Sequence, residues 1–349
     1  MAVLSPRRLA TEVSQKPLVR DTLAGRRKRS GWLWLLEHTL ARDVRVVDQH
    51  IREGRFQRGL ALIAGLSAVL GGLEVTLQHY RGSYSQRVMY SPVFLSPLVL
   101  LAGVWGFFSR RVARTLLPIS SLLLLGDGAL GFIFHVRGIA RKPGGWRIPI
   151  FNVIMGPPIF APLLLGISGF LGVIAAMLRR EDDPPRVKAA GLPGQRPAWL
   201  GLLPRGITRE GVILEHHVRE GRFQKVLAAA TGVSAILNGV EALYPHYKND
   251  FTYKVQWTPI LLAPIVAFAG FGAVASKRIA RTLLPLTSAL AVLNGAIGAF
   301  YHLRGVVRRP GGLKHSFYNT VYGPPLFAPL LFAATGFLGL LASLLRRAD

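Results

Sequence analysis

The chain carries one segment twice, and this internal repeat constrains its fold more than any other feature of the sequence. The eight residues at 50–57, HIREGRFQ, return at 217–224 as HVREGRFQ, an offset of 217 − 50 = 167 positions. With no gap opened, the match continues as far as Arg179-Arg180 and Arg346-Arg347, and roughly 60 of about 130 aligned positions are identical. A repeat of this length predicts a fold built from two similar units.

Apolar and basic residues are segregated along each copy. Half of the residues (50%) are apolar, the formal net charge is +26, and long apolar stretches alternate with arginine clusters. A helix of about 20 apolar residues spans the ~30 Å hydrocarbon core of a bilayer. Strong basicity is also typical of nucleic-acid-binding domains, but here the charge lies between apolar stretches, as in the cytoplasmic loops of membrane proteins. We therefore expect a lipid bilayer with anionic headgroups as the partner, and no nucleic acid.

Each copy contains four candidate membrane spans. In the first copy they lie near residues 59–78, 91–108, 115–135 and 151–178, and in the second near 226–245, 258–275, 282–302 and 318–345. Because each copy has an even number of spans, both copies insert with the same orientation. The expected fold is an all-α integral membrane protein of about eight transmembrane helices, arranged as two tandem parallel four-helix repeats.

The spans and their flanking segments divide the chain into four expected regions. These are a basic cytoplasmic N-terminal arm (1–49), the first repeat (50–180), a Pro/Gly-rich linker (181–216) and the second repeat (217–349). The side that receives the arm, the linker and the clusters at 110–114 and 277–281 is richer in Lys and Arg than the opposite side. The positive-inside rule therefore predicts both termini in the cytoplasm, and we expect a bacterial cytoplasmic membrane.

The fourth span of each copy contains a proline-rich interruption. The sequence GPPIFAP at 156–162 returns as GPPLFAP at 323–329, with Pro157, Pro158, Pro324 and Pro325 at its centre. Three prolines within six residues remove backbone donors and cannot all lie in an unbroken helix. Two interpretations remain open. The break lies within the bilayer and borders a functional site, where protein or water satisfies the backbone, or it lies at the outer interface.

Four histidines close the first and third spans of the two copies: His79, His135, His246 and His302. Each follows a glycine by seven residues, which places both on nearly the same helix face. Imidazole ligands beside a bare helix face would suit a b-type haem in each copy, and Arg137 and Arg304 could pair with its propionates. Against this, glycine in membrane helices commonly serves close helix packing, and Pro245 directly precedes His246.

Glu74 and Glu241 are the only carboxylates set within a span in both copies. An ionisable side chain inside a membrane is a functional-site candidate, because it is costly there unless paired or hydrated. A metal site with His79 is disfavoured, since five residues place the two side chains about 140° apart on the helix. We expect Glu74 to pair with an arginine or a polar group of another helix, or to carry a proton in a transport path. Asp127 aligns with Asn294, so a proton role there would not be shared.

The chain has no cysteine, which excludes disulfides, cysteine-ligated zinc, iron–sulfur clusters and covalently attached haem. No phosphate-binding loop, nucleophile elbow or zinc-protease motif is present, so an enzyme is the least favoured class. The leading hypothesis is a membrane subunit that anchors or electronically serves a partner complex, with haem b as its cofactor. The alternative is an ion- or proton-coupled transporter of small solutes that uses the two glutamates. A ligand-free scaffold is third.

Overall fold

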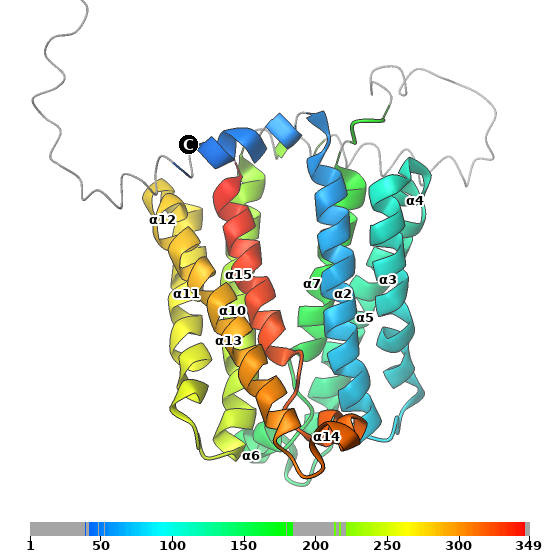
Figure 1. Cartoon of the computed structure of the whole chain (residues 1–349), viewed down its shortest axis with the longest axis vertical. Coiled ribbons are helices and arrows are strands. Elements are labelled where there is room, and N and C mark those ends of the chain that lie inside the picture. Colours follow the sequence, from blue (N-terminus) through cyan, green and yellow to red (C-terminus); the bar gives the residue numbers. More distant parts are fainter. Residues whose placement is uncertain are drawn as a thin grey trace, which may run out of the picture.

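The computed structural model describes residues 53–178, 180–183 and 221–345, together with scattered residues between 39 and 51 and between 213 and 217. The expected N-terminal arm and linker therefore lie largely outside the described residues. Within this described part the chain is helical and contains no strand. Figure 1 shows two groups of helices side by side, one from residues 53–183 (the first half) and one from residues 221–345 (the second half).

The two halves contain the same series of helices. The first half has α2 (Phe56–Arg81), α3 (Ser91–Phe108), α4 (Arg110–Arg114), α5 (Leu116–Ala140), α6 (Pro149–Ile154) and α7 (Ala161–Met177). The second half has α10 (Arg222–Lys248), α11 (Trp257–Ala275), α12 (Lys277–Arg281), α13 (Leu283–Val307), α14 (Ser316–Tyr322) and α15 (Ala328–Leu344). When 167 is subtracted, the bounds of corresponding helices agree to within one residue. We call the end where α2 and α10 begin the upper end, and the end near α6 and α14 the lower end (Figure 1).

Within the described ranges, six helices are long and apolar enough to cross a membrane. Three belong to each half, and they include α2, α3, α5, α10, α11 and α13. These helices agree with the first three spans expected in each copy. The fourth spans are different, because α7 and α15 contain only 17 residues each, about 25 Å of helix. The proline interruption expected within 151–178 and 318–345 is confirmed, since a helix lies on either side of it in each half, and the expected count of eight spans stays a prediction.

A glycine turn and a buried asparagine place the short helix below each half. The turn before α6 has Gly144 at φ 77°, in the left-handed region that glycine adopts without a steric cost. Asn152 is 1% exposed, and its side-chain amide donates hydrogen bonds to the carbonyls of Pro143 (3.0 Å) and Gly145 (2.8 Å). The second half repeats both features with Gly311 (φ 79°) and Asn319. This turn directs the chain back towards the bundle before the interrupted span.

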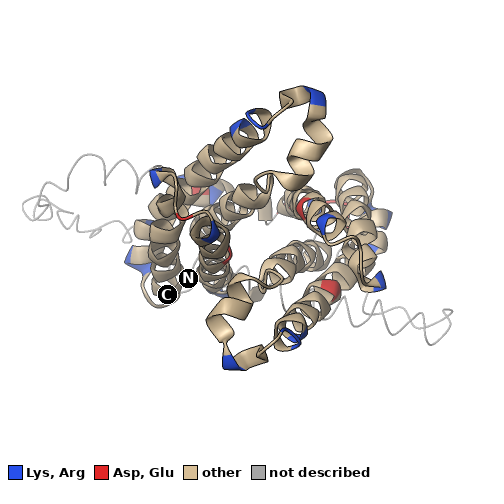
Figure 2. Ribbon diagram, turned by 90° about the horizontal axis from the view of Figure 1, so that it is seen from below, with Lys and Arg blue, Asp and Glu red and all other residues tan. Residues whose placement is uncertain are grey.

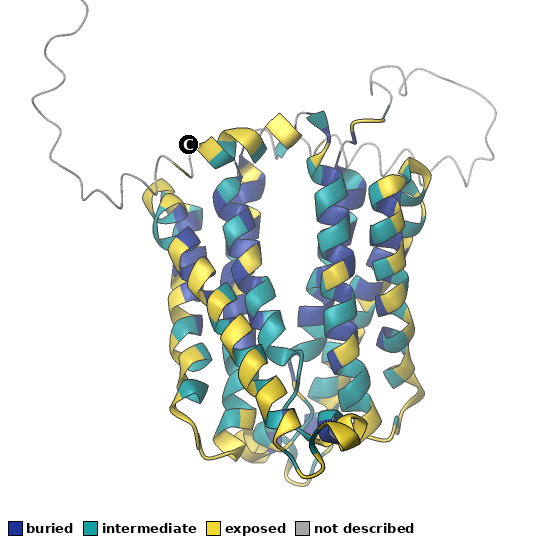
Figure 3. Ribbon diagram, in the orientation of Figure 1, coloured by how far each residue is buried: buried dark blue, intermediate teal, exposed yellow. Residues whose placement is uncertain are grey.

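The outer surface of the bundle is apolar, and the two halves share a core. Large apolar side chains such as Phe94, Phe108 and Phe268 are more than 60% exposed (69%, 72% and 64%), and Figure 3 shows exposed residues along the outer helices. A contiguous apolar surface of this kind is the surface that lipid would cover. Inside, one buried cluster near the upper end joins leucines of both halves, among them Leu60, Leu171, Leu227 and Leu338.

Asp183 holds the upper ends of α4 and α7 together. Its carboxylate accepts hydrogen bonds from the side chains of Arg110 (2.9 Å) and Arg114 and from the backbone N–H of Arg180 (2.9 Å). Arg180 is fully buried and donates to the carbonyls of Gly106 and Phe107. Burial alone would raise the pKa of Asp183, but the hydrogen bonds and charges of these partners outweigh it and lower the pKa below its usual value.

Candidate functional site

Glu74 of the first half accepts a hydrogen bond from the second half of the chain. It lies on α2 and is 6% exposed. Its Oε2 accepts a hydrogen bond from the backbone N–H of Phe327 at 3.0 Å, and its Oε1 accepts one from the side chain of Gln78 at 2.7 Å. Phe327 is the N-cap residue of α15, where backbone N–H groups lack helical partners and the helix dipole favours negative charge. The expected pairing of Glu74 with a polar group of another helix is confirmed, and the group is a backbone amide.

Glu241 makes the equivalent bond in the opposite direction. Its Oε1 accepts a hydrogen bond from the backbone N–H of Phe160 at 2.6 Å, and Phe160 is the N-cap residue of α7 in the first half. Each half therefore supplies a carboxylate to the broken helix of the other half. Reciprocal contacts between equivalent residues are the signature of a two-fold relationship. Gln78 aligns with Pro245, so Glu241 lacks the additional amide bond that Glu74 receives.

The proline segments form the non-helical link before each capped helix. Residues 155–160 and 323–327 are not helical, and they contain Pro157, Pro158, Pro324 and Pro325. Gly138 of α5 allows close approach of Pro157, because an added Cβ would lie 3.3 Å from its ring. Gly305 of α13 does the same for Pro324. The prolines thus pack against a neighbouring helix, and the residues that follow them present their N–H groups to the glutamates.

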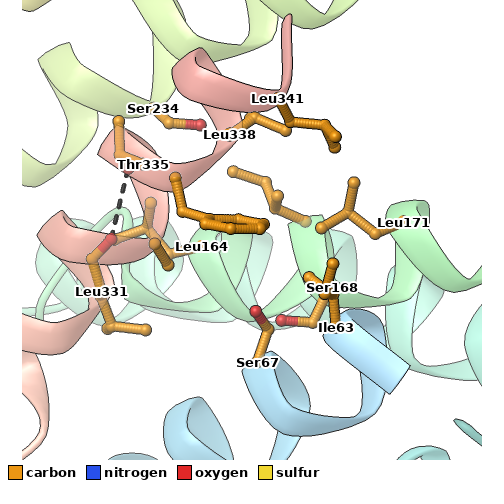
Figure 4. Close-up of a pocket in the computed structure, with 13 residues that line it drawn as sticks. Ile63, Ser67, Leu164, Ser168, Leu171, Ser234, Leu331, Thr335, Leu338 and Leu341 are labelled. Atoms are coloured by element: carbon orange, nitrogen blue, oxygen red, sulfur yellow. Dashed lines mark hydrogen bonds between the residues drawn. The ribbon is translucent and has the colours of Figure 1, made fainter. Parts of the chain in front are cut away.

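A small cavity lies where α2, α7, α10 and α15 meet, between the halves. Its volume is about 40 Å³, which accommodates about three water molecules. Most of the lining is apolar, but four hydroxyl side chains contribute to it: Ser67, Ser168, Ser234 and Thr335 (Figure 4). The offset of 167 relates Ser67 to Ser234 and Ser168 to Thr335. The Ser234 hydroxyl is buried and has no hydrogen-bond partner among the described residues, so it is available to a molecule in the cavity.

The cavity hydroxyls and the glutamates lie on the same helix faces. Ser67 precedes Glu74 by seven residues, and Ser234 precedes Glu241 by seven. Seven residues are about two turns, or about 10 Å along a helix, and return to nearly the same face. Towards the upper end, Leu171, Leu338 and Leu341 belong both to the cavity lining and to the shared apolar cluster. The glutamates therefore lie about two turns below the cavity hydroxyls, and leucines close the upper side of the cavity.

The histidines cluster at the lower end. Three of the histidines form a hydrogen bond between ring atom Nδ1 and a backbone carbonyl. His79 pairs with Met89 at 2.8 Å, His302 pairs with Pro325 at 2.5 Å, and His135 pairs with Pro158. Because a carbonyl oxygen only accepts, Nδ1 must carry the proton, and Nε2 is left as an acceptor or ligand atom. The rings of His246 and His302 lie 6.5 Å apart, so the structure brings this expected pair together.

The glycine argument for haem is wrong. The four glycines that precede the histidines do not leave a bare face for a macrocycle, because other helices fill it. A Cβ on Gly72 would clash with Ser96 of α3, and a Cβ on Gly128 would clash with Pro162 and Gly166 of α7. Gly239 and Gly295 are filled in the same way by α11 and α15. These glycines serve close helix packing. Arg137 and Arg304 are exposed at the helix ends, and their pairing with propionates stays a prediction.

Asp127 has a structural role. Its carboxylate accepts a hydrogen bond from Ser91 of α3 at 2.5 Å. At the equivalent place, the Asn294 amide donates to Thr258 of α11 at 2.7 Å. Both bonds join the second and third long helices of their half, so the position serves helix pairing whether or not it carries charge. Among the described residues, no group of three or more His, Asp or Glu side chains could hold a metal ion.

The geometry indicates a helical membrane bundle with a small, mostly apolar cavity between its halves, to which four hydroxyl groups contribute. Comparison with known families, with curated proteins and with solved structures found no match to this chain. Glu74, Glu241 and the prolines were predicted from the sequence as candidate site residues, whereas the cavity serines were not. The signal that could have found them is the identical spacing of a serine and a glutamate, seven residues apart in both copies.

Proposed function

We propose that this protein is a proton-coupled transporter of small polar solutes, with its site between two parallel four-span halves. The observation that carries the proposal is the reciprocal pair of glutamate caps. Each joins an intramembrane carboxylate of one half to the N-terminus of a broken helix in the other. In transporters, discontinuous helices at the interface between repeats characteristically present such N-termini to anionic groups.

The depth of the helix breaks supports a site inside the bilayer. α2 has 26 residues, about 39 Å of helix, which exceeds a ~30 Å hydrocarbon core by about 9 Å. When α2 is centred on the bilayer, about 5 Å extends beyond the core at each end. Glu74 lies seven residues before Arg81, about 10 Å from the lower end of the helix. The carboxylate and the Phe327 amide then lie about 5 Å inside the hydrocarbon, which favours the first of the two interpretations of the break.

Proton transfer to the glutamates gives a mechanism for coupling. A deprotonated Glu74 accepts a charge-assisted hydrogen bond from the N-cap amide, and charged acceptors make stronger bonds than neutral ones. When Glu74 binds a proton, its charge disappears, and the link between α2 and α15 weakens. Glu241 weakens the link between α10 and α7 in the same way. Proton binding therefore loosens the contact between the halves beside the cavity, and proton release restores it.

The membrane orientation follows the same reasoning. The Lys- and Arg-rich segments 1–49 and 181–216 are continuous in sequence with residues at the upper end of the bundle, so the positive-inside rule assigns this end to the cytoplasm. The glutamates and histidines then lie towards the opposite side. Solutes and protons would enter from that side, and the apolar cluster around Leu60 and Leu227 would close the path to the cytoplasm.

A solute-dependent proton flux assay tests this proposal. The protein would be reconstituted into liposomes that contain a pH-sensitive dye, and amino acids, sugars and organic acids would be added in turn. We expect at least one solute to drive proton uptake. Glu74→Gln and Glu241→Gln should each lower that flux about tenfold or more, since glutamine keeps an acceptor but binds no proton. Glu53→Gln, outside the spans, should leave it unchanged. Folded protein without flux for every solute, or full flux in the double glutamine variant, would contradict the proposal.

A haem-carrying subunit remains the second candidate, and one observation favours it. The rings of His246 and His302 approach to 6.5 Å, and His302 Nδ1 is held by a carbonyl, the kind of outer-shell bond that orients ligating histidines. The spacing of glycine and histidine no longer supports haem, because neighbouring helices occupy the space beside these glycines. A reduced-minus-oxidised absorption spectrum decides: sharp b-type bands that disappear in His302→Ala would support haem, and a flat spectrum of protein expressed with haem supplied would exclude this role.

A further inference from the structure

The lower end of the bundle is almost purely cationic. Four described segments form it, 79–90, 137–149, 246–257 and 304–316. They contain twelve Lys and Arg residues: Arg81, Arg87, Arg137, Arg141, Lys142, Arg147, Lys248, Lys254, Arg304, Arg308, Arg309 and Lys314. Asp250 is the one acidic residue in these segments. Figure 2, a view from below, shows basic positions distributed over this end of both halves.

These cations lack acidic partners, unlike those of the upper end. Every ion pair within the described part of the chain joins residues of 42–58, 110–114 or 180–183. These segments all lie at the upper end. None of the twelve lower cations has a carboxylate within 4.0 Å among the described residues. The charge of the lower end is therefore left for solvent or for a bound anion.

Three of the cations lie at the ends of segments that pack across the boundary between the halves. Lys248 at the end of α10 lies within electrostatic range of Lys142 and Arg81, which belong to the first half. Helix packing across the boundary brings them together. Tyr80 at the end of α2 contacts Phe317 of α14 with ring centroids 5.6 Å apart, and α6 packs against α10. The cluster is thus made by both halves and would not exist in either alone.

The repeat indicates that the cluster has a fourth member. The offset of 167 relates Arg81 to Lys248 and Lys142 to Arg309, so each position is basic in both halves although the residue type changes. The Arg309 Nε is buried and has no hydrogen-bond partner among the described residues. A buried donor without a partner is costly and calls for one. The offset makes Arg309 the counterpart of Lys142, and its side chain lies beside Gly323 of the second half.

We infer that this cluster, Arg81, Lys142, Lys248 and Arg309, binds a phosphate-bearing anion that bridges the two halves. Guanidinium groups match phosphate oxygens as bidentate donors, and lysine ammonium groups add compact positive charge. An anion would neutralise the mutual repulsion of the cations and would supply the acceptor that Arg309 lacks. A free phosphate and a phospholipid headgroup share this chemistry. The inference does not depend on transport, because it concerns different residues from the glutamates and the cavity.

The test compares two triple variants of equal charge in protein purified without phosphate. Arg81→Gln, Lys142→Gln and Lys248→Gln together remove three of the four cations of the cluster, whereas Arg87→Gln, Arg147→Gln and Lys254→Gln remove three other cations from the same end. Inorganic phosphate binding is measured by calorimetry, and bound phospholipid is measured as phosphorus that copurifies in dodecyl maltoside. Thermal melting and gel filtration confirm that all proteins are folded.

We expect phosphate to bind the wild type and raise its melting temperature, as any ligand specific for the folded state does. Loss of about tenfold or more in affinity in the cluster variant, with little change in the control variant, would support a site for free phosphate. Copurified phospholipid that only the cluster variant loses would support a headgroup site. Equal losses in the two variants would show general charge attraction and overturn the inference. So would a wild type that binds neither phosphate nor phospholipid.

Discussion

Glu74 and Phe327 are separated by 253 residues in sequence, yet the carboxylate of one accepts a hydrogen bond from the backbone N–H of the other at 3.0 Å. The bond satisfies an N–H group at the start of a helix that cannot be satisfied within that helix. It also gives an intramembrane carboxylate the partner it needs. One contact thus meets two requirements. The bond between Glu241 of the second half and the Phe160 amide of the first half meets the same two.

Loss of the cap should destabilise the protein more than loss of the charge. Glu74→Leu leaves the Phe327 amide and the Gln78 side chain without an acceptor, and we expect it to lower the free energy of unfolding by about 1–3 kcal/mol. Glu74→Gln keeps an acceptor and should cost about 1 kcal/mol or less. Unfolding in mixed detergent, followed by circular dichroism, measures both. Leu66→Ala, at an exposed site on the same helix, is the control. Equal stability of the leucine and glutamine variants would contradict the capping role.

Asp183 should make the upper end sensitive to acid. Its pKa is lowered in the folded protein, because bonds from Arg114, Arg180 and Arg110 outweigh burial, so the carboxylate stabilises the fold above the unfolded value of about 3.9. This contribution is lost as the pH falls through the lower folded pKa. Asp183→Asn should therefore destabilise the protein at pH 7 and flatten the decline in stability below about pH 4. Melting temperatures between pH 7 and pH 3 measure this, with Asp250→Asn at the opposite end as control. An unchanged decline in Asp183→Asn would refute it.

Two glycines of α5 should respond in opposite ways to substitution. A Cβ on Gly128 would lie 2.6 Å from the Pro162 carbonyl oxygen and 2.7 Å from the Gly166 Cα, both of which are backbone atoms. Gly128→Ala should therefore destabilise the protein by about 1–3 kcal/mol, through overpacking that a side-chain rotation cannot relieve. Gly126 has open space at its Cβ position, and Gly126→Ala should be neutral or stabilise the helix by up to about 1 kcal/mol. Thermal unfolding of both variants in one detergent makes the comparison. Similar melting temperatures would show that α5 and α7 are not packed this closely.

The cavity serine should separate stability from function. Ser234→Ala removes a buried hydroxyl that has no partner among the described residues, so we expect stability to be unchanged or to rise by about 1 kcal/mol. The same variant should reduce solute-dependent proton flux severalfold, because the hydroxyl faces the cavity. Ser343→Ala provides the contrast, since the Ser343 hydroxyl donates to the Gly339 carbonyl at 2.8 Å away from the cavity. It should leave flux unaltered. Full flux in Ser234→Ala would remove the cavity from the transport path.

The sequence predicted the long helices better than the contacts between them. Apolar length and the 167-residue offset were sufficient to place α2, α3, α5 and their counterparts, because a bilayer core imposes a length on every span. The prolines likewise predicted the break before α7, since a missing backbone donor is a local property. The partner of Glu74 could not be predicted, because it is a backbone amide on a distant helix. The role of Gly72 could not be predicted for a related reason. A bare helix face accommodates a helix or a cofactor equally well, and only the structure shows that Ser96 of α3 occupies the space beside Gly72.

The reciprocal caps also bear on how such a chain could arise. Each half holds a glutamate and an N-cap amide, but both of their bonds run to the other half. A polypeptide containing a single half would therefore leave its own carboxylate and its own amide unmatched. Two copies of that polypeptide would satisfy both bonds at once, since the contact is self-complementary. The two halves are thus related to each other as the subunits of a homodimer would be, and a covalent link between them allows equivalent positions to differ, as Gln78 and Pro245 do.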